Sequence, residues 1–144
     1  MIAEEDLAQE IFTLLYRLVG NLRQYFDQTA ADFGLPSTQA KALLRLAEPA
    51  PMSTLAAALQ CDPSNVTGIV DGLESRGLVE RRVAERDRRV KHLAVTVKGV
   101  RLRSRLRKRL FENMPAVSGL AHSERLLLRD LLHKGLADDL PSVS

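Results

Sequence analysis

The chain has 144 residues, of which 45% are hydrophobic and 27% charged, and its formal net charge is +3. This length suits one integrated unit, and the composition excludes disordered, fibrous and collagen-like chains. The single cysteine excludes an intramolecular disulfide, and no apolar run approaches the roughly 20 residues of a membrane span.

Three helices are predicted in the first part of the chain from apolar residues that recur every three or four positions. A long amphipathic helix ends before Gly34. The second helix begins near Pro36, which suits a first helical turn, and ends where Pro49 interrupts the pattern. A short third helix over 54–60 is expected to be capped by Ser53.

The fourth predicted helix, 63–76, has two contrasting faces. We expect Asp62 to cap its N-terminus and Gly77 to end it. One face is an apolar stripe, which indicates burial against a core. The opposite face carries only small or polar side chains, namely Ser64, Asn65, Thr67, Gly68 and Asp71.

The pattern then changes from helical to alternating, which predicts two short strands over 78–83 and 90–95. The hairpin tip between them carries Arg86, Asp87, Arg88 and Arg89. After the hairpin, Thr96 is expected to cap a helix that Pro115 closes, and a last leucine-rich helix is predicted over about 123–139.

The charge is distributed unevenly along the chain. Residues 1–75 have a net charge of −6 and residues 110–144 a net charge of −2. Residues 76–109 hold 14 basic and 3 acidic residues, a net charge of +11. Such an excess within one segment favours a polyanionic partner over an ordinary solvated surface.

Two short helices followed by a cationic hairpin predict a winged helix-turn-helix, and the fold class is therefore mainly α with a small β-hairpin. The second helix of such a pair lies in the major groove of double-stranded DNA. Ser64, Asn65 and Thr67 offer short hydrogen-bonding groups for base edges, and Gly68 permits close approach. The hairpin arginines suit the negative potential of the minor groove.

Residues 55–99 resemble the MarR (multiple antibiotic resistance regulator) family of bacterial and archaeal transcription factors. The resemblance is carried by Asn65-Val66-Thr67, Val70-Asp71, Gly77-Leu78-Val79, Asp87-Arg88-Arg89, and Leu93 followed by Val95-Thr96 and Gly99. The order and spacing of these motifs are specific. Outside this region, the resemblance depends on the pattern of helices alone.

The resemblance implies a homodimer that binds a pseudo-palindromic operator and acts as a repressor released by a small aromatic or lipophilic effector. It divides the chain into an N-terminal dimerisation helix (1–34), a DNA-binding region (35–96) and C-terminal dimerisation helices (97–144). The leucine-rich terminal helices independently favour an interface, because they offer more apolar surface than one small winged domain covers.

By the same resemblance, Asp87 orients the wing arginines and Arg88 or Arg89 enters the minor groove. Weaker candidates for phosphate contact are Arg76, Arg81 and Lys91. Many members of the family carry a basic residue where this chain has Gly68. We therefore expect base reading to depend more on Asn65 and on DNA shape.

The effector crevice has four candidate lining residues, Phe12, Tyr16, Phe111 and Met114, although their helical spacing favours ordinary packing. Cys61 is expected to be a small buried side chain, with a redox role as the minor alternative. We treat the three histidines, His92, His122 and His133, as non-ligands and expect no metal or other cofactor.

The sequence has no phosphate loop, nucleophile elbow or carboxylate pair in an apolar context, so we do not expect an enzyme. The acidic N-terminus lacks a basic signal-peptide region, which indicates a cytoplasmic protein with no membrane partner. Three alternatives stay open: a non-specific nucleoid-type DNA binder, a winged domain for protein interaction, and a membrane-surface module using the arginine-rich helix 97–114.

Overall fold

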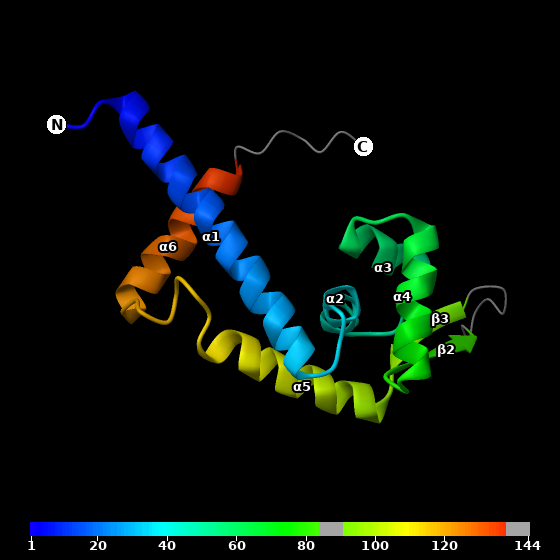
Figure 1. The fold of residues 1–144 in the computed structure, drawn as a ribbon. Coiled ribbons are helices and arrows are strands. Elements are labelled where there is room, and N and C mark those ends of the chain that lie inside the picture. Colours follow the sequence, from blue (N-terminus) through cyan, green and yellow to red (C-terminus); the bar gives the residue numbers. More distant parts are fainter. Residues whose placement is uncertain (84–90, 138–144) are drawn as a thin grey trace. The chain divides into compact units, whose positions relative to one another are not determined.

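The computed structural model describes residues 1–83 and 91–137 (Figure 1). In chain order, the described elements are α1 (Glu4–Asp32), α2 (Ser37–Arg45), β1 (Ala50–Pro51), α3 (Met52–Leu59), α4 (Pro63–Ser75), β2 (Val79–Val83), β3 (Lys91–Val95), α5 (Val97–Glu112) and α6 (His122–Ala137). The predicted class, mainly α with a small antiparallel sheet, is confirmed.

The chain forms two compact units. The winged unit comprises Arg23–Phe111, and the terminal unit comprises Met1–Leu22 with Glu112–Ser144. Leu106 of α5 is fully buried in the same core as the residues of α2, α3 and α4. These limits differ from the expected boundaries at 34 and 96, because α5 and the second half of α1 supply side chains to the winged core.

The core of the winged unit is almost entirely aliphatic. Its largest fully buried side chains come from all the helices of the unit except α1, and from both strands of the hairpin: Leu43, Leu46, Leu55, Val66, Val70, Leu73, Leu78, Val79, Leu93 and Leu106. Each buried Leu or Val contributes about 1.5–3 kcal/mol relative to an exposed position. This core holds α4 and the hairpin in a fixed relation to each other.

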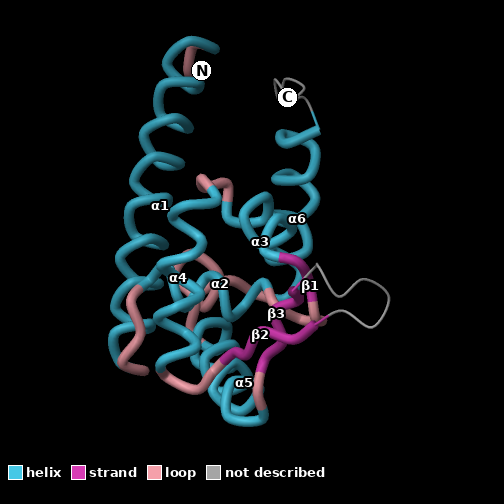
Figure 2. The backbone as a smooth tube through the Cα atoms, turned by 90° about the vertical axis from the view of Figure 1, so that its right-hand side faces the viewer, coloured by secondary structure: helices cyan, strands magenta, loops and turns pink. Residues whose placement is uncertain are grey.

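The sheet has three strands in the order β1-β3-β2, all antiparallel (Figure 2). β2 and β3 form the predicted hairpin, in which Arg81 pairs with Leu93. β1 is a strand that the sequence did not predict. It consists of Ala50 and Pro51, which pair with Leu93 and His92.

Two of the predicted helix boundaries are confirmed in detail. Gly77 has a φ of +73° and follows α4, and the next amide, of Leu78, donates to the carbonyl of Leu73 at 3.0 Å. Thr96 caps α5 because its Oγ1 accepts a hydrogen bond from the amide of Gly99 at 3.1 Å.

Two predicted side-chain caps are wrong. α3 begins at Met52, before Ser53, and Pro51 occupies its N-cap position without a side-chain bond. Asp62 does occupy the N-cap position of α4, but its side chain caps nothing. Its backbone carbonyl instead accepts the amide of Val66 at 3.2 Å.

The terminal unit exposes large apolar side chains on both of its long helices. α6 has no buried residue, and Leu126, Leu127, Leu131, Leu132 and Leu136 are all exposed. The part of α1 in this unit exposes Leu7, Ile11, Phe12, Leu14, Leu15, Tyr16 and Val19. Within residues 1–83 and 91–137, no helix is both long and apolar enough to cross a membrane.

Candidate nucleic-acid interface

The two faces predicted for α4 are present. Val66, Val70 and Leu73 are fully buried against α2 and α3. The opposite face is open to solvent, and its exposed residues are Ser64, Asn65, Thr67, Gly68 and Asp71. A Cβ built on Gly68 would meet no atom within 4 Å, so this position faces open space and no side chain projects from the helix there. α4 thus presents small hydrogen-bonding groups on a rigidly supported helix.

The hairpin starts directly after α4 and packs against it. Val79, the first residue of β2, is buried, whereas Val83 and Lys91 at the far end are exposed. The predicted wing tip, with Arg86, Asp87, Arg88 and Arg89, lies outside the described residues, so these assignments stay predictions.

Arg81 of β2 reaches across to α4 and pairs with two carboxylates. Its Nη2 lies 2.7 Å from Oδ1 of Asp71, and its Nη1 lies 2.6 Å from Oε1 of Glu74. The hydrogen bond to Asp71 is the largest cause that raises the pKa of the Arg81 guanidinium above its ordinary value. Arg81 was predicted from the sequence only as a weaker candidate for phosphate contact, and this ion pair was not predicted.

Arg76 lies where the ends of α1, α4 and α5 meet. Its Nη1 donates to the carbonyl of Gly34 at 2.8 Å, and its own carbonyl accepts Nζ of Lys98 at 2.8 Å. The hydroxyl of Thr96 donates to the carbonyl of Gly77 at 2.6 Å. Arg76, predicted to touch DNA, therefore also bonds a carbonyl of the loop between α1 and α2.

The described basic residues of this segment lie mainly on α5 and not on α4 or the two strands of the hairpin. α5 holds seven of the basic residues and one acidic residue, whereas α4, β2 and β3 together hold three basic and three acidic residues. Several α5 cations have partners within the winged unit. Arg103 donates to the carbonyl of Leu46, Arg109 pairs with Asp32 at 3.3 Å, and Lys98 bonds the carbonyl at the end of α4.

Gln39 of α2 is a feature of this surface that the sequence did not indicate. Its amide lies against Gly72, where a Cβ would fall 2.2 Å from Nε2 of Gln39. Its Oε1 is buried and has no hydrogen-bond partner among the described atoms. A side chain at position 72 would therefore displace the amide of Gln39, and a periodicity analysis has no signal for such a contact.

The four residues predicted to line an effector crevice are divided between the two units. Phe12 and Tyr16 are 65% and 74% exposed, and their ring centroids lie 5.8 Å apart. Phe111, also exposed, belongs to the winged unit, where the guanidinium of Arg107 lies 5.7 Å from its ring centroid. Met114 belongs to the terminal unit and is partly exposed. Their proposed pocket role remains a prediction.

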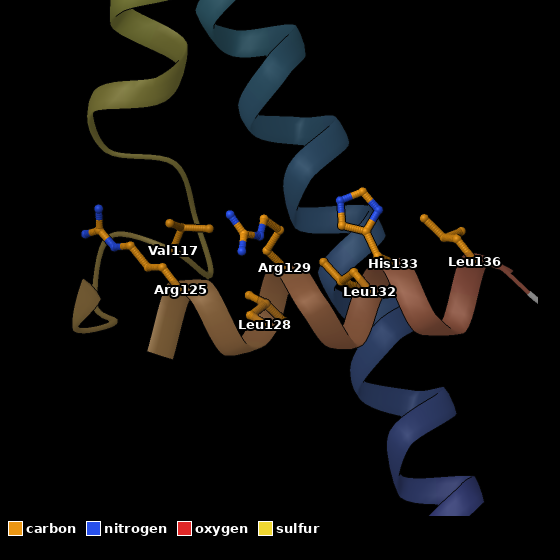
Figure 3. Close-up of a pocket in the computed structure, with 7 residues that line it drawn as sticks. All are labelled: Val117, Arg125, Leu128, Arg129, Leu132, His133 and Leu136. Atoms are coloured by element: carbon orange, nitrogen blue, oxygen red, sulfur yellow. The ribbon is translucent and has the colours of Figure 1, made fainter. Parts of the chain in front are cut away.

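A separate apolar hollow of about 330 Å³ runs along α6, and none of these four residues lines it. Figure 3 shows its lining side chains, which are Val117, Arg125, Leu128, Arg129, Leu132, His133 and Leu136. Cys61 lies outside this hollow. It is partly buried and packs against the core of the winged unit, where a small buried side chain was expected from the sequence.

Comparison with known proteins agrees with this geometry. The model of the MarR family matches residues 35–91, from the start of α2 to the start of β3. The crystal structure of CouR from Rhodococcus jostii RHA1, bound to p-coumaroyl-CoA, is 29% identical with a TM-score of 0.73, covering 94% of this chain and 98% of CouR. Over residues 35–91, the chain is therefore similar to the MarR family.

Two further proteins are similar to different extents of the chain. The transcriptional repressor MprA of Escherichia coli K12 is 49% identical over 47 residues, which are 33% of this chain and only 27% of MprA. A point mutant of MepR from S. aureus, bound to an oligodeoxyribonucleotide, is 25% identical with a TM-score of 0.61, covering 88% of this chain and 96% of MepR.

Proposed function

We propose that this protein is a member of the MarR family and a sequence-specific DNA-binding transcriptional regulator that acts as a repressor and not as an enzyme. The observation that carries the proposal is the exposed polar face of α4, supported from below by the buried Val66, Val70 and Leu73 and followed directly by the hairpin. MprA is a repressor and MepR binds DNA, which supports the same activity here. Such a regulator acts in the cytoplasm, where bacterial DNA is accessible.

In the proposed complex, α4 enters the major groove and the hairpin reaches the neighbouring minor groove. Asn65 is the residue best suited to read a base, because its amide can bond adenine bidentately. Ser64 and Thr67 bond bases or phosphates, and Gly68 lets the helix approach closely. Lys91, and the tip arginines Arg86, Arg88 and Arg89 oriented by Asp87, contact the backbone and the minor groove.

We further propose that two copies associate through the terminal unit. The exposed leucines of α6 and the exposed apolar residues of α1 form larger apolar faces than a monomeric protein commonly leaves in water. A twofold dimer would place two copies of α4 about one helical turn apart on a pseudo-palindromic operator. A small aromatic or lipophilic effector would release this dimer from DNA, and the binding of the aromatic thioester p-coumaroyl-CoA by CouR supports an effector with an aromatic group.

The balance of charge favours specific over non-specific binding. α4, β2 and β3 carry equal numbers of acidic and basic residues, whereas a non-specific binder depends on cations that contact phosphates. A nucleoid-type role is therefore the weaker candidate.

Selection of bound duplexes from a random pool at physiological salt tests the proposal directly. We expect enrichment of an inverted repeat with half-sites about 10 base pairs apart. Retention of duplexes without enrichment would instead favour a backbone-binding protein. The enriched duplex then serves as the probe in a release assay with aromatic acids and their coenzyme A thioesters, p-coumaroyl-CoA among them.

A further inference from the structure

The proposed recognition helix has an unusual charge. α4 contains no lysine, arginine or histidine, and its two ionisable residues are Asp71 and Glu74. Asp71 lies one turn after Thr67 and Gly68, on the same exposed face, and its side chain is 60% exposed. The side chain of Glu74 is 42% exposed. A helix with this charge would be repelled by the phosphates that flank a major groove.

The guanidinium of Arg81 forms ion pairs with both carboxylates. Each terminal nitrogen of its guanidinium contacts a different acid, at 2.7 Å for Asp71 and 2.6 Å for Glu74. The strand that carries Arg81 is held firmly, because its pairing partner in β3 is the fully buried Leu93. The Arg81 side chain is only 23% exposed, less than the side chains of both acids.

We propose that Arg81 is a neutralising residue that lets the acidic face of α4 approach the DNA backbone. The inference rests on the proposed function, and it assigns Arg81 a role other than direct phosphate contact. The guanidinium cancels one of the two negative charges and holds both carboxylates toward β2.

This arrangement extends along β2. The guanidinium of Arg82 contacts the carboxylate of Glu80 at 2.5 Å, which pairs a second arginine of the strand with an acid. The described surface around α4 is therefore assembled from matched charges. Affinity for DNA would come from base reading by α4 and from the hairpin tip more than from contacts between α4 and phosphates.

Four proteins test the inference: Arg81→Met, Asp71→Asn with Glu74→Gln, the triple variant that combines these changes, and Arg109→Met. Arg109 pairs with Asp32 in the same unit, so Arg109→Met removes one cation from an ion pair away from α4. Affinity for the selected duplex is measured from about 50 to 300 mM salt, the range in which phosphate contacts show their salt dependence. Circular dichroism and melting verify the fold of each variant.

We expect Arg81→Met to weaken binding about tenfold at low salt, with a loss that shrinks as salt screens the repulsion. The triple variant should recover to within about threefold of the wild type, and Arg109→Met should change affinity by less than about threefold, since exposed ion pairs contribute little. The double variant keeps Arg81 and should bind more tightly than the wild type, so it remains decisive if Arg81→Met fails to fold.

Three results would overturn the inference while leaving the proposed function intact: wild-type affinity in Arg81→Met, a loss that salt does not change, or a folded triple variant that does not recover. Weaker binding by the double variant would overturn it as well. If the wild-type chain binds no duplex in the selection, the proposed function fails and this inference fails with it.

Discussion

Gly99 offers the sharpest test of the packing described above. It lies in the first turn of α5, where a Cβ would fall 2.1 Å from the carbonyl oxygen of Leu78 and 2.6 Å from Cγ1 of Val95. Ordinary contacts begin near 3.4 Å, so the overlap exceeds 1 Å. The Leu78 carbonyl accepts a hydrogen bond from the amide of Thr96 at 3.0 Å, and the Leu78 side chain is buried. The carbonyl therefore cannot move easily away from an added Cβ.

Gly99→Ala should therefore destabilise the winged unit. Overpacking costs about 1–3 kcal/mol and sometimes more, and contact with backbone places this site at the upper end. The higher helix propensity of alanine returns up to about 1 kcal/mol. We expect a net loss of about 2 kcal/mol in the free energy of unfolding. Gly68→Ala is the matched control, because a Cβ there meets nothing within 4 Å.

The assay is urea denaturation followed by circular dichroism, at one fixed protein concentration because association shifts apparent stability. Gly68→Ala should gain up to about 1 kcal/mol from helix propensity. The two glycine-to-alanine changes thus have opposite signs. If Gly99→Ala proved as stable as the wild type, with an unchanged dependence on urea, the close approach of α5 to Leu78 would be wrong.

Four further predictions concern the surface, the interface and one link between α1 and α5. Asn65→Ala should reduce discrimination between the operator and a scrambled duplex more than it reduces total affinity, as competition binding would show. Arg89→Ala should weaken operator binding by at least about 1 kcal/mol in titrations while light scattering still shows a dimer. Leu131→Asp should shift the light-scattering mass toward a monomer, because it places a charge on the exposed apolar face of α6. The Tyr25 hydroxyl bonds the carbonyls of Arg109 at 2.9 Å and Leu110 at 3.2 Å, so Tyr25→Phe should cost about 1 kcal/mol in urea denaturation. An unchanged result in any of these measurements would contradict the corresponding assignment.

Features specified by neighbouring residues could be predicted from the sequence. The two faces of α4, the stop at Gly77 and the cap by Thr96 each depend on a few adjacent positions, and the structure has all three. Ser53 failed as a cap although its residue type is suitable, because α3 begins at Met52, two residues before the predicted start of the helix. Residue type alone does not determine which residue begins a helix.

Features that depend on distant residues could not be predicted in this way. β1 exists because Ala50 and Pro51 meet β3, which lies about forty residues later in the chain. The pairing of Arg81 with Asp71 and Glu74 likewise joins a strand to a helix. A count of charges along the chain identified a basic segment, but it did not separate the α5 cations that bond carbonyls from those available to a partner.

The short strand β1 also has a consequence for the behaviour of the protein at high concentration. It covers one side of β3 with only two residues, and the second of them, Pro51, has no backbone N–H. A strand from another molecule would therefore find almost no ladder of donors along this edge. β3 is thus paired on that side by β1, and this edge of the sheet does not favour pairing with strands of other molecules.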